Sequence, residues 1–231
     1  MPKPPVPDEF GGLPVVTAQR MRELDAAATS QHGVPADTLM ENAGRAVARE
    51  AVSWLGRPGK FVVCCGRGAN GGDGLVAARA LKEAGASAKV FICPAKRDAP
   101  YPKLVLDNLD RCGKAGVEVV ETGEEAGLRE ALAGCDAAID ALLGTGSNGK
   151  PAGAVHHMIQ ELTRSKKPVL SVDIPSGLQP DTGYHSGVVV TATVTFALGL
   201  PKRGLVTAHA QRFVGELRVL DIGYPKELLR A

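Results

Sequence analysis

Short apolar runs alternate with amphipathic stretches from residue 60 onwards, and this alternation limits the fold more than any other feature. The first run, KFVVCC at 60–65, is typical of a buried strand because β-branched and apolar residues dominate it. Further strands are predicted at 88–94, 117–121, 136–143, 168–174, 189–199 and 216–222, and helices between them at 74–86, 100–116, 124–134 and 153–165. The pattern predicts an α/β fold, a Rossmann-like three-layer α/β/α sandwich with a mostly parallel central sheet.

Two more helices are predicted ahead of this sheet, at 17–33 and 35–56. Thr17 is placed to cap the first helix, and Gly56 ends the second. Residues 1–14 have four prolines in their first seven positions and are predicted to be a disordered or extended tail. Residues 15–231 are predicted to form one domain, which is long enough to bury a core.

The charge balance argues against a nucleic-acid or membrane partner. The chain has 27 Lys and Arg against 25 Asp and Glu, a formal charge of +2. Its longest apolar run, 188–200, has 13 residues including three Thr, so it is too short to span a bilayer as a helix. The five cysteines include no C-x-x-C pair and several lie in apolar runs, so we expect buried, reduced thiols in a cytoplasmic protein.

Glycine is in excess, at 28 of 231 positions, and many glycines follow predicted strands. The strand at 60–65 leads into GRGANGGDG at 66–74, where Gly66, Gly68 and Gly71 match G-x-G-x-x-G. Glycines there permit positive φ angles and bare backbone N–H groups. The helix start that follows favours an anion such as a nucleotide phosphate. A tight strand-to-helix turn is the structural alternative.

This glycine segment differs from an ordinary dinucleotide site in two ways. The next strand ends without the acidic residue that holds a ribose, since CPAKR follows at 93–97. Asn70 and Asp73 are also unusual within a simple diphosphate cradle. We expect them to bind a cation or ligand hydroxyl groups.

Two acidic residues stand near later strand ends. Asp140 lies inside the strand at 136–143, ahead of a glycine-rich loop at 144–150. A buried carboxylate needs a partner, which is either a cation or the backbone N–H groups of that loop. Asp173 ends the next strand, where ligands bind in parallel sheets, so it is a candidate for proton transfer, with an Asx turn as the alternative.

Lys202 and Arg203 follow the strand predicted at 189–199. Either side chain is long enough to reach a phosphate or an oxyanion. A solvated surface pair is the structural alternative, and this segment alone favours it. Ser176 and Gly177, shortly after Asp173, offer a hydroxyl group and a close backbone approach.

Six segments together resemble the NAD(P)HX epimerase family, the YjeF N-terminal domain. They are LMENAGRAVA (39–48), GRGANGGDG (66–74), DALLGTG (140–146), VDIPSGL (172–178), TFALGLPKRGL (195–205) and VLDIGYP (219–225). They stand in the family's order and cover nearly the whole chain after the tail. The resemblance implies an often dimeric enzyme that interconverts the R and S hydrates of NADH and NADPH, which are called NADHX and NADPHX.

The resemblance also implies the site. A potassium ion near the substrate phosphates would be held by Asn70, Asp140 and Ser176. Asp173 is expected to shuttle a proton in acid–base epimerisation at C6 of the hydrated ring, with Lys202 assisting it. The hydrate is expected to contact two loops and one acid, namely Ala69, Asn70, Gly71, Gly72, Asp73, Gly144, Thr145, Gly146, Ser147, Asn148, Gly149, Lys150 and Asp173.

One residue departs from the family pattern. Ala69 stands where the family commonly has Asn, so a side-chain amide is lost while the backbone N–H is kept. Family members supply the S form to an ADP- or ATP-dependent dehydratase. The chain ends at Ala231 without room for that activity, so a separate dehydratase is the expected partner.

Other functions stay open at this point. Related domains serve as non-catalytic nucleotide- or RNA-binding dimerisation modules, although the near-neutral charge and the retained Asn70, Asp140, Asp173 and Ser176 argue against this. An ordinary NAD-dependent oxidoreductase is a second alternative, but this sequence lacks the acidic residue that holds the ribose and a catalytic Tyr-Lys or Cys pattern. A sugar or vitamin kinase is a third alternative, but no phosphotransfer base motif is visible in this sequence.

Overall fold

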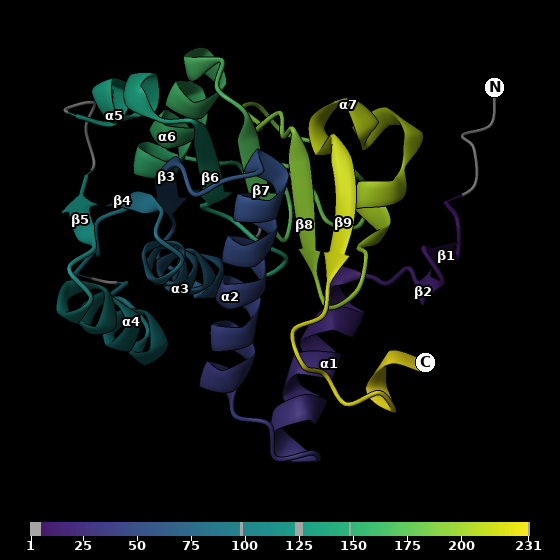
Figure 1. The fold of residues 1–231 in the computed structure, drawn as a ribbon. Helices are drawn as coiled ribbons and strands as arrows, with labels where there is room; N and C mark the ends of the chain where they lie inside the picture. The colour runs from purple at the N-terminus through teal and green to yellow at the C-terminus, as the bar shows by residue number, and fades with distance from the viewer. Residues whose placement is uncertain (1–5, 98, 123–126, 148, 231) are drawn as a thin grey trace.

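A seven-stranded sheet organises the chain, in the order β5-β4-β3-β6-β7-β8-β9 (Figure 1). The computed structural model describes residues 6–97, 99–122, 127–147 and 149–230. The strands are β3 (Lys60–Cys65), β4 (Ser87–Ile92), β5 (Glu118–Glu121), β6 (Ala137–Ala141), β7 (Val169–Val172), β8 (Val194–Leu198) and β9 (Glu216–Leu220). All neighbours in this sheet pair in parallel, which confirms the predicted α/β fold. The strand order reverses between β3 and β6, and open α/β sheets bind ligands at such a point.

Helices cover both faces of the sheet because the side chains of each strand alternate between them. In β3, Phe61, Val63 and Cys65 pack toward one face, while Val62 and Cys64 pack toward the other. Figure 1 shows α3 and α4 below the sheet and α5 and α6 above it. The helices are α1 (Ala18–Ser30), α2 (Ala36–Leu55), α3 (Ala69–Glu83), α4 (Lys103–Lys114), α5 (Leu128–Gly134), α6 (Gly153–Ser165) and the short α7 (Gln211–Val214).

The N-terminal segment is tied to the carboxyl edge of the sheet. Strands β1 (Glu9–Phe10) and β2 (Leu13–Pro14) pair as a small hairpin within the segment expected to be a disordered or extended tail. Residues 1–5 of that segment lie outside the described residues. Val16 then pairs in parallel with Lys202, and Thr17 caps α1 by accepting a hydrogen bond from the Arg20 N–H. Helix α1 is therefore anchored beside the loop that follows β8.

The third helix begins earlier than the sequence indicates. It was expected to start at Gly74, but α3 starts at Ala69, so Asn70 and Asp73 lie in its first turns rather than in a loop. The glycines of this segment do not adopt positive φ angles, contrary to expectation. An added Cβ would lie 1.9 Å from the Leu142 carbonyl oxygen at Gly66, and 1.9 Å from the Gly66 carbonyl oxygen at Gly71. These glycines are needed because β3, α3 and the chain after β6 approach one another closely.

Two other predicted elements are shorter than expected. The strand predicted at 189–199 covers only Val194–Leu198 in β8, because the residues before it bond elsewhere: the Val190 N–H donates to the Ser176 carbonyl and the Ala192 N–H to the Phe213 carbonyl. The helix predicted at 124–134 is described from Leu128, and residues 123–126 lie outside the described residues. The five cysteines are free and buried, as expected. No helix in the described ranges combines the length and apolar character needed to cross a membrane.

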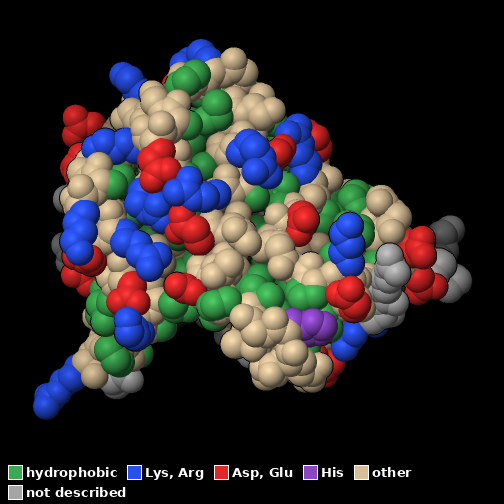
Figure 2. Space-filling view, turned by 60° about the horizontal axis from the view of Figure 1, so that its bottom comes forward, with side chains coloured by type: hydrophobic (Ala, Val, Ile, Leu, Met, Phe, Trp, Pro, Cys, Tyr) green, Lys and Arg blue, Asp and Glu red, His purple; other side chains and the backbone are tan. Residues whose placement is uncertain are grey.

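Opposite charges are interspersed on the helical surface. Arg79 of α3 and Arg45 of α2 each pair with both Glu41 and Glu83. Figure 2 shows Lys and Arg side chains beside Asp and Glu on the face that is turned forward. This face therefore presents no broad field of positive charge.

Replacing Gly71 with Ala is expected to destabilise the fold, because the new methyl group would meet the Gly66 carbonyl oxygen. Such overpacking costs about 1–3 kcal/mol. Gly113 in α4 is the matched control, since nothing lies within 4 Å of its added Cβ and Ala is the better helix former by about 1 kcal/mol. Urea unfolding measures both effects. A Gly71→Ala variant as stable as Gly113→Ala would contradict the close contact.

Candidate functional site

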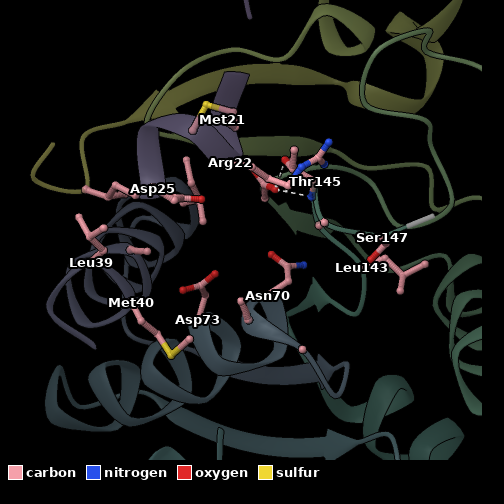
Figure 3. Close-up of a pocket in the computed structure, with 18 of the residues that line it drawn as sticks. Met21, Arg22, Asp25, Leu39, Met40, Asn70, Asp73, Leu143, Thr145 and Ser147 are labelled. Atoms are coloured by element: carbon pink, nitrogen blue, oxygen red, sulfur yellow. Dashed lines mark hydrogen bonds between the residues drawn. The ribbon is translucent and has the colours of Figure 1, made fainter. Parts of the chain in front are cut away.

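A cavity of about 550 Å³ opens at the carboxyl edge of the sheet, where the strand order reverses (Figure 3). The segments after β3, β6, β7 and β8 contribute to its wall, and α1 and α2 cover it from the other side. Figure 3 shows Asp25 of α1 and both Asn70 and Asp73 of α3 extending into the same space. The cavity thus gathers polar side chains from segments far apart in the sequence.

Asp173 is held in place by two segments of chain. Its Oδ2 accepts hydrogen bonds from the Thr145 backbone N–H at 2.8 Å and from the Thr145 hydroxyl at 2.6 Å. Its Oδ1 forms an ion pair with Lys202 Nζ at 2.6 Å. The φ angle of Asp173 is +68°, a left-handed conformation that few non-glycine residues adopt. Such strain is retained where the surroundings fix the residue, and here it turns the carboxylate into the cavity.

Lys202 is buried rather than solvated. Its side chain is 1% exposed, and Nζ also donates a hydrogen bond to the Leu198 carbonyl oxygen at 2.7 Å. The surface alternative weighed for the Lys202–Arg203 pair is therefore wrong for Lys202, whereas Arg203 is exposed. Pairing with Val16 draws the Lys202 backbone inward, which explains why the sequence around it did not reveal the burial.

The carboxyl groups of the cavity have pKa values shifted in opposite directions. Burial opposes ionisation of Asp173, but the Lys202 ammonium and the Thr145 hydrogen bonds outweigh it, so the pKa of Asp173 is lowered. Burial raises the pKa of Asp73 well above its ordinary value, and the nearby charges of Asp173 and Asp25 raise it further. One cavity therefore holds an ionised carboxylate and a carboxyl group that resists ionisation, the arrangement that acid–base chemistry needs.

Asn70 is buried, and its side chain has no hydrogen-bond partner among the described residues. The residue is 8% exposed, and neither its amide nitrogen nor its amide oxygen forms a hydrogen bond within the part of the chain that the structure describes. An added Cβ at Gly144 would lie 2.9 Å from Asp173 Oδ2 and 3.1 Å from Asn70 Cγ. A glycine is therefore required between these two side chains, and the free amide indicates that a ligand completes the site.

Asp140 lies beneath the cavity wall, in the middle of the sheet. Its Oδ1 accepts hydrogen bonds from the Ser176 hydroxyl at 2.6 Å and the Leu142 N–H at 3.3 Å. Its Oδ2 accepts from the Ser171 hydroxyl at 2.9 Å and the Ser176 N–H at 2.8 Å. The backbone donors are Leu142 and Ser176, and none of the described residues of the 144–150 loop supplies the N–H contact that the structural alternative for Asp140 required. The four bonds also fasten the chain after β6 to the chain after β7.

Sequence reasoning missed the helical side of the cavity. Asp25 of α1 and Tyr224, after β9, were not singled out, yet both line the cavity and the Tyr224 hydroxyl donates a hydrogen bond to Asp25 Oδ1. Arg22 and Met40 line it as well. One signal was present: Asp25 follows Leu24 on the face of α1 that buries Met21 and Ala28, and an acidic residue beside an apolar helix face needs a reason.

The structure brings together many of the residues expected in the site. Those lining the cavity are Ala69, Asn70, Asp73, Gly144, Thr145, Gly146, Ser147, Asp173 and Lys202. Gly149 and Lys150 line a neighbouring cavity, and Asn148 lies outside the described residues. Gly71 and Gly72 line neither cavity, because Gly71 packs against Gly66 and Gly72 against Met40.

Comparison with known proteins shows the family to which the chain belongs. Residues 36–204 match the family model of the YjeF-related protein N-terminus. An NAD(P)H-hydrate epimerase of Elusimicrobium minutum is 39% identical over 94% of this chain and 99% of its own length. A bifunctional NAD(P)H-hydrate repair enzyme of Thermofilum pendens is 43% identical, but this chain spans only 41% of that relative's length. The crystal structure of the yeast protein ynu0 has a TM-score of 0.76 at 27% identity, with 83% of each chain covered.

Replacing Lys202 with Met is expected to lower the free energy of unfolding at neutral pH, because Asp173 then stays buried without its cation. The loss is about 3–5 kcal/mol, and adding Asp173→Asn recovers much of it because the amide carries no charge. The lowered pKa of Asp173 means that the stabilisation is present above the ordinary carboxyl pKa and is lost as the pH falls.

Chemical denaturation at pH 7 compares these variants with Lys226→Met at an exposed position, where a change within about 0.5 kcal/mol is expected. A Lys202→Met variant that loses no more stability than Lys226→Met would contradict the buried ion pair.

Proposed function

The chain belongs to the family of YjeF-related protein N-termini, and we propose that it is an NAD(P)H-hydrate epimerase. The resemblance inferred from the sequence motifs is thus confirmed. The enzyme is an isomerase that interconverts the R and S forms of NADHX and NADPHX in the repair of nicotinamide nucleotides. Relatives that carry the epimerase name match along nearly their full length, which supports assigning this activity to the chain as it stands.

One observation carries the chemistry: a single cavity at the strand-order switch contains carboxyl groups with opposite pKa shifts. Inversion at C6 of the hydrated ring requires its C–O bond to break and re-form on the opposite face, or the ring to open and close. Either route needs one group that donates a proton and one that accepts it. Asp73 is suited to donate, and Asp173 is suited to accept.

Lys202 acts on this chemistry through Asp173. Its ammonium keeps the Asp173 carboxylate ionised, and the hydrogen bonds from Thr145 fix the direction of that carboxylate. Asp25 and its partner Tyr224 line the same cavity, and burial raises the pKa of Asp25 as it does that of Asp73. A ring placed in this cavity would meet an acid and a base together.

The diphosphate is positioned away from the reacting ring. The start of α3 and the loop Gly144–Ser147 line the cavity, and a helix N-terminus favours an anion. Binding energy from the phosphates can then be used to orient the ring. Ala69 keeps its backbone N–H at this position, so the missing amide side chain removes one contact and leaves the cradle otherwise intact.

Potassium is proposed as the resident ion, held by Asn70, Asp140 and Ser176. The donors are an amide, a carboxylate and a hydroxyl, and such oxygen ligands suit a hard cation. The partnerless Asn70 amide supports the fit, as does a fully buried Asp140 for which the described residues provide no ion pair. When bound, the ion would supply positive charge near the substrate phosphates. Asp140 would contribute negative charge from beneath the cavity wall, where its oxygens also accept hydrogen bonds from Ser171 and Ser176.

The partners implied by the resemblance stay predictions. Curated relatives include bifunctional repair enzymes that are more than twice as long as the matched region, which supports a dehydratase as the functional partner. A separate ADP- or ATP-dependent dehydratase is accordingly the proposed consumer of the S form. A homodimer and a cytoplasmic location belong to the same set of predictions.

The alternative function, an RNA-binding module of the same fold, is less well supported than the epimerase function. Arg45 of α2 and Arg79 of α3 are paired with Glu41 and Glu83, and Figure 2 shows mixed charge on the forward face. Nucleic-acid binding rests on unpaired positive charge along one surface. The polar cavity with its shifted carboxyl groups has no role in such a module.

Replacing Asp173 with Asn is expected to lower kcat/KM about 10²–10⁴-fold, because the proton acceptor is lost. The assay incubates the protein with R-NADHX and an S-specific dehydratase, and it follows consumption of the R form. Asp110→Asn on the exposed surface of α4 is the control and keeps the parental rate. Parental activity in Asp173→Asn would remove this residue from the mechanism.

The pH profile separates the two carboxyl groups. The rate is expected to fall at acid pH as Asp173 is protonated, below the usual carboxyl range because its pKa is lowered. It falls at higher pH as Asp73 ionises, above the usual range because its pKa is raised. The Asp73→Asn variant should not show the fall in rate at higher pH, because the side-chain amide has no proton to lose there. An unchanged profile in that variant would exclude Asp73 as the donor.

Removing potassium is expected to raise KM, and potassium is expected to raise the melting temperature of the wild-type protein more than choline does at equal ionic strength. A stabilising ligand at 100 times its Kd contributes about 2.7 kcal/mol. Asn70→Ala should lose this thermal response, because the Asn70 amide oxygen has no other partner among the described residues. Equal melting temperatures in potassium and choline would refute the proposed ion site.

A further inference from the structure

A second cavity, of about 380 Å³, adjoins the first. Arg67, Leu143, Ser147 and Val155 line both cavities, so the two form one continuous surface. The remaining wall comes from the segment after β4, including Cys93, Pro94 and Lys96, and from residues 149–154 at the start of α6. A ligand longer than the first cavity can therefore extend into the second.

The second cavity lies beyond the carboxyl end of β4, the strand beside β3. In dinucleotide-binding sheets this place receives the ribose of the adenosine half. An acidic residue there accepts a hydrogen bond from the ribose 2′-hydroxyl of NAD, whereas a basic residue accommodates the 2′-phosphate of NADP. The charges at the end of β4 therefore decide which nucleotide fits.

Among the described residues, the acidic residue beside this strand end is already engaged. Glu121, at the end of β5, accepts hydrogen bonds through Oε1 from the Ala95 N–H at 2.9 Å and from the Tyr101 hydroxyl at 2.9 Å. It thus holds the segment after β4 in place and does not line the cavity. The charged side chains that do line it, within the described ranges, are Arg67, Lys96 and Lys150, and all three are basic.

Arg67 independently indicates an anion-binding position. Its guanidinium Nη1 is buried, and no hydrogen bond to it exists in the part of the chain that the structure describes. A buried cationic donor without a partner is unfavourable unless a ligand supplies the acceptor. Arg67 lies where the two cavities meet, which suits a phosphate group midway along a dinucleotide.

We propose that the second cavity binds the adenosine half of the substrate, with Lys96 and Lys150 receiving a 2′-phosphate, so that the protein favours NADPHX over NADHX. The hydrated ring then occupies the first cavity, and Arg67 contacts the diphosphate between the two. The identity of the hydrated ring rests on the proposed epimerase function. The preference for a 2′-phosphorylated nucleotide does not depend on turnover and is tested by binding alone.

Calorimetric titration of the full chain with NADP⁺ and with NAD⁺ tests this directly. NADP⁺ is expected to bind at least about tenfold more tightly, which corresponds to 1.4 kcal/mol. The double variant Lys96→Ala/Lys150→Ala should bring NADP⁺ down to the affinity of NAD⁺ and leave NAD⁺ unchanged. Lys103→Ala/Lys114→Ala, at exposed lysines of α4, is the matched control and retains the preference. Arg67→Ala should weaken both nucleotides equally.

Equal affinities for NADP⁺ and NAD⁺, or a lysine double variant that weakens both alike, would overturn the 2′-phosphate site. Competition by 2′,5′-ADP but not by 5′-ADP at equal concentration would support it. A protein that keeps the NADP⁺ preference yet fails to epimerise R-NADPHX would refute the proposed function while the nucleotide site stands.

Discussion

The buried ion pair between Asp173 and Lys202 joins the parts on which the site depends. Lys202 belongs to the loop after β8, and its pairing with Val16 attaches the segment before α1 to this loop. Asp173 follows β7, and its hydrogen bonds from Thr145 attach the loop after β6. Neither charge is tolerable alone at this depth, since an unpaired buried charge costs several kcal/mol. The pair therefore fixes the fold at the carboxyl edge and sets the ionisation of the proposed base at the same time.

Glycines make this convergence possible by the space they leave. Gly66 and Gly71 let α3 start directly after β3 and beneath the chain that follows β6, and Gly144 leaves room between Asn70 and Asp173. The excess of glycine suggested flexible loops with positive φ angles, but at these positions its effect is close packing. Early entry into α3 also places Asn70 and Asp73 one turn apart on a helix, so both extend into the cavity in fixed directions.

Local patterns in the sequence were sufficient to predict that the sheet and its helices form, and at which strand ends ligands bind. Asp173 was found because it ends an apolar run and Asp140 because it lies within one, and both are purely local signals. The burial of Lys202 and the presence of Asp25 and Tyr224 were not foreseeable in this way, because each depends on contacts between distant segments. The start of α3 was misplaced because glycine is a poor helix former, and tertiary packing overrides that preference here.

The central claim is that the hydrated ring lies between Asp73 and Asp173 while the adenosine half lies beyond β4. A crystal structure of the Asp173→Asn variant soaked with S-NADPHX tests it most directly. The account predicts the C6 hydroxyl within hydrogen-bonding reach, about 2.6–3.2 Å, of residue 173 or Asp73, with the 2′-phosphate near Lys96 and Lys150. A nucleotide bound in the reverse direction, with adenosine beside Lys202, would contradict it.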